Sequence, residues 1–132
     1  DNDPKFPFGF GLSYTDFKYS NFNLSSENLK GNQTLTINVN VANIGKFDGE
    51  EVVQLYTRDL FGKVVRPIKE LKGFQKIFLK KGESRNVTFK LTPDDLKFYD
   101  DALNYDWEAG EFEIMVGTNS SDVMVKKIVW EK

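Results

Sequence analysis

Three pairs of neighbouring acidic residues are the groups in this sequence that could carry acid–base chemistry: Glu50-Glu51, Asp94-Asp95 and Asp100-Asp101. Two carboxyl groups that converge on a substrate can act as general acid and general base. Neighbours along a strand point to opposite faces, so adjacency argues against convergence at Glu50-Glu51. Because acidic side chains are mostly exposed in folded proteins, we expect all three pairs to be solvated carboxylates in turns and at strand edges.

Histidine and cysteine are both absent from the sequence. Their absence excludes Ser-His and Cys-His catalytic pairs, disulfide bonds and thiolate metal sites, and it removes the commonest zinc ligand. The turn at 43–49 carries Asn and Asp side chains but lacks the ordered acid spacing of a calcium loop. We therefore expect neither a metal nor a cofactor.

Four aromatic residues could form a platform on which a sugar ring stacks, and they are Trp107, Trp130, Tyr105 and Phe61. The alternative is that these rings pack in the core or on a sheet face, as large aromatic side chains more often do. The sequence leaves both interpretations open.

Arg66, Lys69 and Glu70 lie in a long excursion, 60–72, between two expected strands. The planar guanidinium of Arg66 could grip a carboxylate on a partner domain. In the alternative, Arg66 and Pro67 hold the loop while Lys69 and Glu70 pair locally, since surface ion pairs are common and contribute little. This choice also stays open.

Strand patterns dominate the chain that must position these residues. The clearest is 33–43, where apolar residues alternate with polar ones, as in an antiparallel strand with one buried face. Other strands are expected at 17–24, 50–59, 73–79, 84–92, 111–117 and 122–130, with a helical turn after Thr92 and a strand pair or corner within 98–107. About seven short strands at spacings of about 8–12 residues predict an all-β, two-sheet sandwich.

Two expected strands depart from simple alternation. In 73–79, Phe74 and Phe78 have the opposite phase to the aliphatic residues, which predicts a bulge or burial on both faces. In 122–130, Lys127 shares the phase of the valines, which we interpret as the core phase, so we expect an edge strand or a bulge there.

Charge and hydropathy limit the partners. The formal net charge is −2 and the lysines are scattered among carboxylates, which argues against nucleic acid. No apolar run approaches the length of a membrane span, and the first residues, DNDPK, lack the order of a signal peptide. We expect no membrane partner, and a mature fragment or an interior piece of a longer protein.

The stretch 6–14, FPFGFGLSY, carries four aromatic rings and no charge. Burying Phe6, Phe8, Phe10 and Tyr14 would contribute about 6–12 kcal/mol. Ordering nine residues of backbone costs roughly 9–18 kcal/mol, so the stretch needs a surface that receives its rings well. In the isolated chain we expect Tyr14 and Phe17 to pack on the sandwich and residues 1 to about 8 to be mobile or held by a neighbouring molecule.

Four blocks of sequence, in order, closely resemble one family: FPFGFGLSYTDF, GEEVVQLYTRD, RPIKELKGFQKIFLKKGES and AGEFEIMVG. The resemblance is to the fibronectin type III-like domain at the C-terminal end of glycoside hydrolase family 3 enzymes, mainly β-glucosidases and β-xylosidases. It covers nearly the whole chain, and the first and third blocks are individually specific.

The resemblance implies an immunoglobulin-like (fibronectin type III-like) antiparallel sandwich over 17–132, with 1–16 as an aromatic connector from an upstream catalytic domain. In the family both catalytic carboxylates lie upstream of this region, and neither of their motifs is present here. The implied role is a non-catalytic accessory domain that packs against and stabilises the catalytic domains of the same chain. A homo-oligomer interface is a further option, and the family favours a periplasmic or extracellular location.

The same resemblance suggests residues for docking on those domains: Phe6, Phe8, Phe10, Tyr14, Phe61, Arg66, Lys69 and Glu70. Two alternatives stay open, because a fold never decides function. One is a carbohydrate-binding module that uses Trp107, Trp130 and Tyr105, and the other is a free-standing adhesion or interaction domain.

Overall fold

The computed structural model describes residues 15–60, 69–99 and 102–132, and every structural statement below concerns these residues. Strands dominate them, joined by turns and by one single-turn 3-10 helix. The elements are β1 (Phe17–Leu24), β2 (Asn28–Lys30), β3 (Leu35–Asn43), β4 (Gly49–Asp59), β5 (Glu70–Leu79), β6 (Ser84–Leu91), η1 (Pro93–Leu96), β7 (Phe98–Tyr99), β8 (Tyr105–Asp106), β9 (Gly110–Gly117) and β10 (Val123–Glu131).

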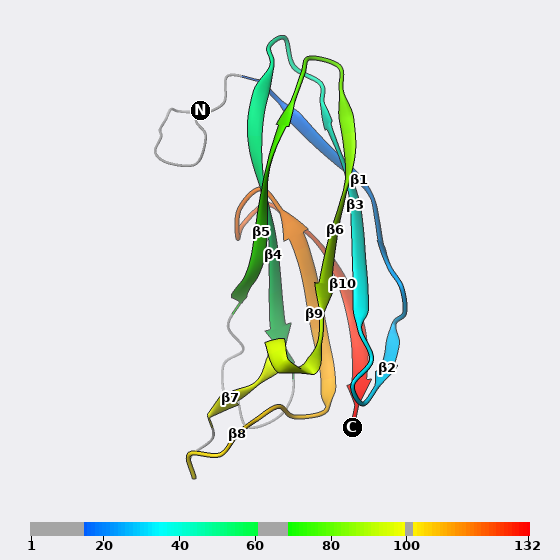
Figure 1. The fold of residues 1–132 in the computed structure, drawn as a ribbon, viewed down its shortest axis with the longest axis vertical. Coiled ribbons are helices and arrows are strands. Elements are labelled where there is room, and N and C mark those ends of the chain that lie inside the picture. The colour runs from blue at the N-terminus through cyan, green and yellow to red at the C-terminus, as the bar shows by residue number, and fades with distance from the viewer. Residues whose placement is uncertain (1–14, 61–68, 100–101) are drawn as a thin grey trace.

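The strands form two facing sheets, which confirms the predicted sandwich (Figure 1). One sheet has the order β1-β3-β6 and the other the order β2-β10-β9-β4-β5. Neighbouring strands are antiparallel except β2, which runs parallel to the end of β10. The short hairpin β7–β8 extends from one end of the sandwich, and it confirms the strand pair expected within 98–107 (Figure 1).

Side chains from the inner faces of both sheets make one hydrophobic core. Strict alternation in β3 places Leu35, Ile37, Val39 and Val41 at 0% exposure, and Trp130 of the opposite sheet is also at 0%. Each such side chain contributes roughly 1.5–3 kcal/mol by leaving water. The core is therefore assembled from residues far apart in sequence.

A bulge in β1 turns three aromatic rings toward the interior. The pairing of β1 with β3 shifts between Ser20 and Asn23, and Asn21 has a φ of 53° within this bulge. The extra residue reverses the alternation, as bulges do. Phe17 and Tyr19 before the bulge and Phe22 after it therefore all contact the core.

The last strand has the opposite phase to the one predicted. Ile128 and Trp130 face the core at 1% and 0% exposure, whereas Val125 is 48% exposed and lies on the outer face with Lys127. The expected edge is present at Lys127, because β9 pairs along one side of β10 whereas β2 pairs on the other side only with its last three residues. The lysine thus faces solvent without any bulge in the β9–β10 pairing.

The bulge predicted within 73–79 is absent, because Gly73 to Leu79 pair with β4 without interruption; the register shifts one residue earlier, between Leu71 and Gly73. The alternative, burial on both faces, is not observed. Phe74 and Phe78 lie on the outer face at 63% and 47% exposure. At the edge of the sheet, the side-chain amide of Gln75 on β5 donates to the carbonyl of Thr88 on β6 at 2.6 Å, and so links the two sheets.

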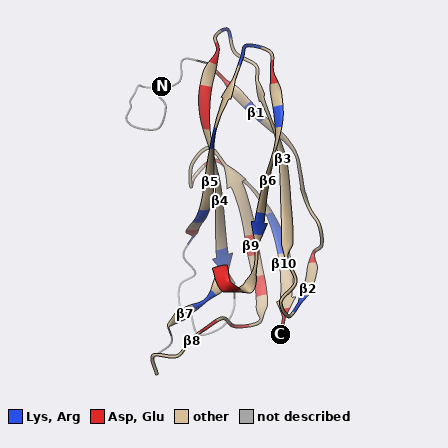
Figure 2. Cartoon of the chain, viewed as in Figure 1, with Lys and Arg blue, Asp and Glu red and all other residues tan. Residues whose placement is uncertain are grey.

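Charged side chains of both signs are distributed along the two sheets (Figure 2). Typical pairs join neighbouring strands, such as Lys76 with Glu50 at 3.4 Å and Arg58 with Glu113 at 3.5 Å. Within the described ranges, no helix has the length and apolar character needed to cross a membrane.

Candidate functional site

A cavity of about 390 Å³ opens between the two sheets, where β1 lies across β4, β9 and the β9–β10 turn. Apolar side chains such as Phe17, Val116, Val123 and Met124 form part of its lining, and polar ones form the rest: Lys18, Glu51, Thr118 and Asp122. The volume falls within the range of roughly 300–1,000 Å³ that is typical of small-molecule sites. The cavity is therefore the strongest candidate site on the described part of the chain.

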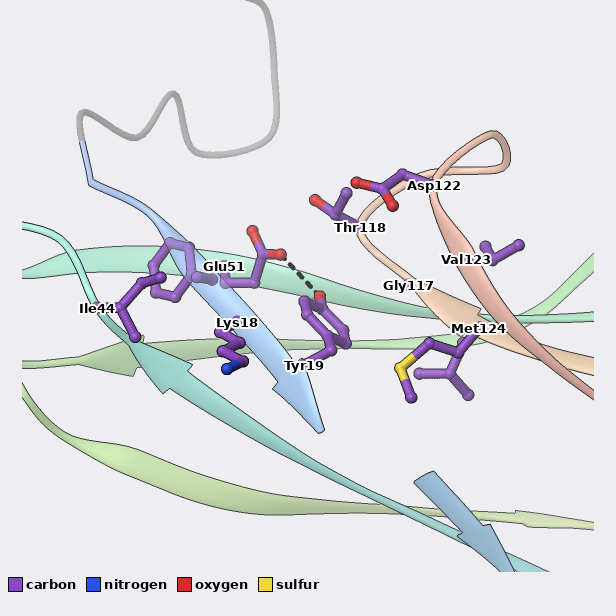
Figure 3. Close-up of a pocket in the computed structure, with 11 residues that line it drawn as sticks. Lys18, Tyr19, Ile44, Glu51, Gly117, Thr118, Asp122, Val123 and Met124 are labelled. Atoms are coloured by element: carbon purple, nitrogen blue, oxygen red, sulfur yellow. Dashed lines mark hydrogen bonds between the residues drawn. The ribbon is translucent and has the colours of Figure 1, made fainter. Parts of the chain in front are cut away.

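One carboxyl group and one phenol face each other in this cavity. The hydroxyl of Tyr19 on β1 donates to Oε2 of Glu51 on β4 at 2.7 Å, and so joins the two sheets (Figure 3). Thr118 and Asp122 lie at the β9–β10 turn on the same opening (Figure 3). This side of the cavity is polar and accepts hydrogen bonds, in contrast to the apolar part of its lining.

Burial shifts both titrating groups toward their neutral forms. Desolvation raises the pKa of Glu51, and hydrogen bonds from Tyr19, Thr118 and the backbone of Val52 oppose this only in part. Desolvation, followed by the nearby charge of Glu51, raises the pKa of Tyr19 well above its ordinary value. The pair therefore acts as a fixed donor and acceptor, with the tyrosine proton directed at the carboxyl group.

The cavity shows no centre for metal chemistry. In ranges 15–60, 69–99 and 102–132, no three His, Cys, Asp or Glu side chains gather closely enough to hold a metal ion. What the arrangement offers is an open hollow with a partly apolar lining and two carboxyl groups, Glu51 and Asp122. Such a site suits a ring or aliphatic group that carries a single hydroxyl or amino group.

A smaller hollow of about 190 Å³ lies near the β7–β8 hairpin, and Thr57, Lys72, Leu96 and Phe112 are among its lining residues. Its charged groups are paired, since Lys72 contacts Glu70 at 2.7 Å. It therefore offers a ligand less unpaired polar surface than the larger cavity does.

The acid pairs of the sequence are separated as the strand geometry requires. Glu50 is exposed on the outer face, whereas Glu51 lies in the cavity, so the expectation that both are solvated is wrong for Glu51. Asp94 is exposed and contacts Lys97 at 2.9 Å, and Asp95 accepts from the backbone of Thr92 at 2.8 Å as a cap of η1. Residues 100 and 101 lie outside the described ranges.

Two of the proposed sugar-stacking residues belong to the core. Trp130 is 0% exposed and donates from Nε1 to the carbonyl of Gly31 at 2.9 Å. Trp107 is 7% exposed, and its ring meets that of Trp130 edge-on at 6.2 Å. Neither ring offers an open face to a sugar. Tyr105 does remain accessible, at 54% exposure, beside Tyr99 on the hairpin.

Of the proposed docking residues, the structure describes two. Lys69 donates to the carbonyl of Ser120 at 2.6 Å, and Glu70 forms its ion pair with Lys72. The two do not pair with each other, although both have local partners. The remaining candidates lie outside the described residues, and they are Phe6, Phe8, Phe10, Tyr14, Phe61 and Arg66.

The sequence of this chain matches a known protein family. Residues 51–120, which are more than half of the chain, match the family described as the fibronectin type III-like domain. The chain belongs to the fibronectin type III-like family. This agrees with the sandwich topology and confirms the resemblance noted in the four sequence blocks.

Relatives of this fibronectin type III-like domain are parts of much longer enzymes. It is 44% identical over 129 residues to thermostable β-glucosidase B of Acetivibrio thermocellus, covering 96% of this chain and 17% of that protein. It is 48% identical over 120 residues to a β-xylosidase of Formosa agariphila, covering 91% and 17% respectively. A crystal structure of a β-glucosidase from Listeria innocua in complex with isofagomine superposes with a TM-score of 0.86 at 37% identity, covering 98% of this chain and 18% of that one.

The chain thus spans about one sixth of the length of the relatives that it matches. The match extends over almost all of the fibronectin type III-like domain, so it is not restricted to a short motif. The likeness to the Listeria innocua enzyme likewise covers the whole sandwich.

Sequence reasoning missed two residues of this domain that organise the site. Glu51 has no local signal of burial, because its partner Tyr19 lies 32 residues away on the other sheet. Asn43 is 1% exposed and bonds to Thr15, Phe47 and Leu79. The sequence signal for Asn43 was its place at the end of an apolar strand and before a turn, where asparagine side chains often bond to nearby backbone.

Proposed function

We propose that this chain is a non-catalytic accessory domain of a longer glycoside hydrolase, a β-glucosidase or β-xylosidase, where it packs against and stabilises the catalytic domains. The observation that carries the proposal is the pattern of coverage. More than nine tenths of the chain aligns with enzymes named β-glucosidase or β-xylosidase, yet it accounts for 17% of their length. Most of each relative, and so most of its capacity for chemistry, lies in other parts of the polypeptide.

The carboxyl groups support a role without catalysis. A retaining glycosidase needs two carboxyl groups about 5–5.5 Å apart across the bond that it cleaves. Here Glu51 accepts a hydrogen bond from Tyr19, and Asp94 and Asp106 are held by Lys97 and Lys132, each at 2.9 Å. Each of these carboxyl groups therefore already has a local partner.

Exposed apolar side chains support a role in contact. Phe74 is 63% exposed on the outer face of β5, and Leu71 is 51% exposed on the same strand. At the β7–β8 hairpin Leu103 is 78% exposed between two exposed tyrosines. Apolar groups gathered in this way favour a packing partner. In this proposal residues 1–16 form the connector to the upstream domain, and Phe6, Phe8 and Phe10 pack against it.

Hydrolysis by the purified chain tests the absence of catalysis. We expect no release of aryl alcohol from aryl β-glucosides or β-xylosides above the buffer rate. Cleavage that follows the chain through purification and scales with its concentration would overturn the proposal. The residues encoded before Asp1 supply a second test: an upstream barrel and α/β domain agree with an accessory role, whereas further sandwiches would favour an adhesion protein.

One observation favours carbohydrate binding as a second candidate. Tyr99 and Tyr105 are 67% and 54% exposed, and their ring centroids lie 4.7 Å apart on the hairpin. If this pair holds a sugar, the chain is retained on insoluble cellulose or xylan and Tyr105→Ala abolishes the retention. Equal recovery of the intact chain with and without polysaccharide removes this candidate.

A further inference from the structure

The first described residue of the chain is fixed firmly at one end of the sandwich. The hydroxyl of Thr15 donates to Oδ1 of Asn43 at 2.7 Å, and the backbone N–H of Ile44 donates to the carbonyl of Asp16 at 2.9 Å. Asn43 in turn donates from Nδ2 to the carbonyls of Phe47 at 2.8 Å and Leu79 at 3.0 Å. The chain before Thr15 therefore starts from a defined place beside the β3–β4 turn.

Apolar surface surrounds this place. Ile44 is 61% exposed and Phe47 is 59% exposed on the β3–β4 turn. Ile44 also lines the 390 Å³ cavity, so the exposed surface of the turn continues into the cavity through this side chain. Phe17, only two residues after Thr15, forms a wall of the same cavity.

The chain that leads into Thr15 has the matching composition. Residues 6–14 carry no charge, and Leu12 and Tyr14 are the apolar residues nearest to Thr15. Three residues of extended chain span about 10 Å, so both side chains are within reach of Ile44 and of the cavity. Phe6, nine residues before Thr15, can instead extend about 30 Å away.

Tyrosine is the side chain of this segment that best fits the cavity. Its ring matches the apolar part of the lining, and its hydroxyl can donate to a carboxylate, as buried tyrosine hydroxyls usually must. Asp122 lies on the cavity lining together with Glu51, whose Oε2 accepts from Tyr19. A phenylalanine ring has no hydroxyl to donate to Asp122, whereas Glu51 already accepts from Tyr19 and Thr118.

We propose that the cavity and the exposed Ile44 and Phe47 are the docking surface for residues 12–14 of this same chain, with the ring of Tyr14 in the cavity and Leu12 across the two turn residues. The contact lies within one domain and does not depend on the activity of the longer protein. It divides the aromatic stretch in two, with Leu12 and Tyr14 packed on the sandwich and Phe6, Phe8 and Phe10 left for a partner.

Thiol labelling tests this docking, because the chain has no cysteine of its own. Ile44→Cys is introduced into the full chain and into a chain that starts at Thr15, and the rate of reaction with a small thiol reagent is compared. We expect Ile44→Cys to react about tenfold more slowly in the full chain, equivalent to about 1.4 kcal/mol of protection. Phe74→Cys is the matched control, since Phe74 has nearly the same exposure, 63% against 61%, and lies on the outer face of β5.

A second variant guards against a truncated chain that does not fold. Leu12→Ala with Tyr14→Ala keeps the full length and is expected to restore the fast labelling of Ile44→Cys while leaving Phe74→Cys unchanged. Equal rates in the full, truncated and doubly substituted chains would overturn the proposal. Protection that grows with protein concentration would also overturn it, because a second copy would then be the occupant. Protection that appears only when cellobiose is added would point to a sugar instead.

Discussion

Replacing Glu51 by glutamine should change how the stability of the domain depends on pH. Burial raises the pKa of Glu51 in the folded state, so the folded protein binds this proton more tightly than the unfolded chain does. That contribution to stability is complete below the unfolded pKa, about 4.3, and is lost as pH rises through the folded pKa. Glutamine retains a carbonyl that can accept from Tyr19, but it cannot ionise.

The magnitude follows from the linkage between pKa and stability. Each unit by which the folded pKa exceeds the unfolded one removes about 1.4 kcal/mol from the wild type at neutral pH. Relative to the wild type, Glu51→Gln should therefore gain stability between about pH 4 and pH 7. In a domain of this length, 1 kcal/mol corresponds to roughly 3–5 °C in Tm. If the amide packs less well than the carboxyl group, the unfolding free energy of Glu51→Gln changes by the same amount at every pH, so the difference in pH dependence is unaffected.

Urea unfolding at a series of pH values from 3 to 8 measures the effect, and Glu50→Gln is the matched control. Glu50 is the neighbouring residue on the outer face, where its contact with Lys76 is 3.4 Å and both side chains are about half exposed. Such a surface pair contributes at most about 1 kcal/mol. Tyr19→Phe should steepen the wild-type dependence, because it removes a donor that stabilises the charged form of Glu51. A difference between Glu51→Gln and wild type that stays flat with pH would refute this account of the cavity.

Two further substitutions test the packing that shapes the site. Trp130→Ala should lower the free energy of unfolding by about 3–5 kcal/mol, because it empties a fully buried position and leaves the carbonyl of Gly31 without its donor. The urea midpoint measures this loss. A loss below about 1 kcal/mol would contradict the burial of Trp130. Gly45→Ala places a Cβ 2.0 Å from the hydroxyl oxygen of Thr15, so the turn must move. Faster amide exchange at Ile44, whose N–H bonds to Asp16, is the expected sign, and unchanged exchange would argue against the close approach.

The alternation of β3 explains why the fold class could be predicted from sequence. In an antiparallel strand with one wet face, the residue type at every second position reports burial directly, and 35–41 follow this rule without exception. The bulge of β1 also left a signal, since it reverses the phase of the aromatic residues along that strand. Local pattern was sufficient wherever one face of a strand is polar.

The phase of β10 could not be read in this way, because apolar residues occupy both of its faces. Valine favours strands whichever way it points, so the three valines outweighed Ile128 and Trp130 in the prediction. Side-chain volume decides the orientation of β10 instead. Trp130 is the largest fully buried side chain among the described residues, and its burial fixes which face of β10 is inside. Lys127 then falls on the outer face with no conflict.

The candidate site depends on a contact that no local pattern contains. Strand geometry correctly separated Glu50 from Glu51, but it could not say which of the two faces the interior. That is decided by the pairing of β4 with β5 and β9 and by the approach of Tyr19 from the other sheet. A carboxylate in this position is costly to bury, and hydrogen bonds from Tyr19 on one sheet and from Thr118 and the backbone of Val52 on the other reduce that cost.

The distribution of aromatic rings bears on the proposed role of this domain as an accessory part of a longer protein. The two tryptophans, which as isolated residues suggest a sugar platform, are used inside the core, and the exposed rings are phenylalanines and tyrosines at strand edges, turns and the hairpin. Phe47 lies at one end of the sandwich and Tyr99 at the other, while Phe74 lies on the outer face of β5. A surface with apolar groups at both ends and on one face is better suited to contact with several neighbouring segments of protein than to a single ligand. Substitutions at these rings should therefore affect assembly of the longer protein more than the stability of this domain, because exposed side chains contribute little to folding of the isolated sandwich.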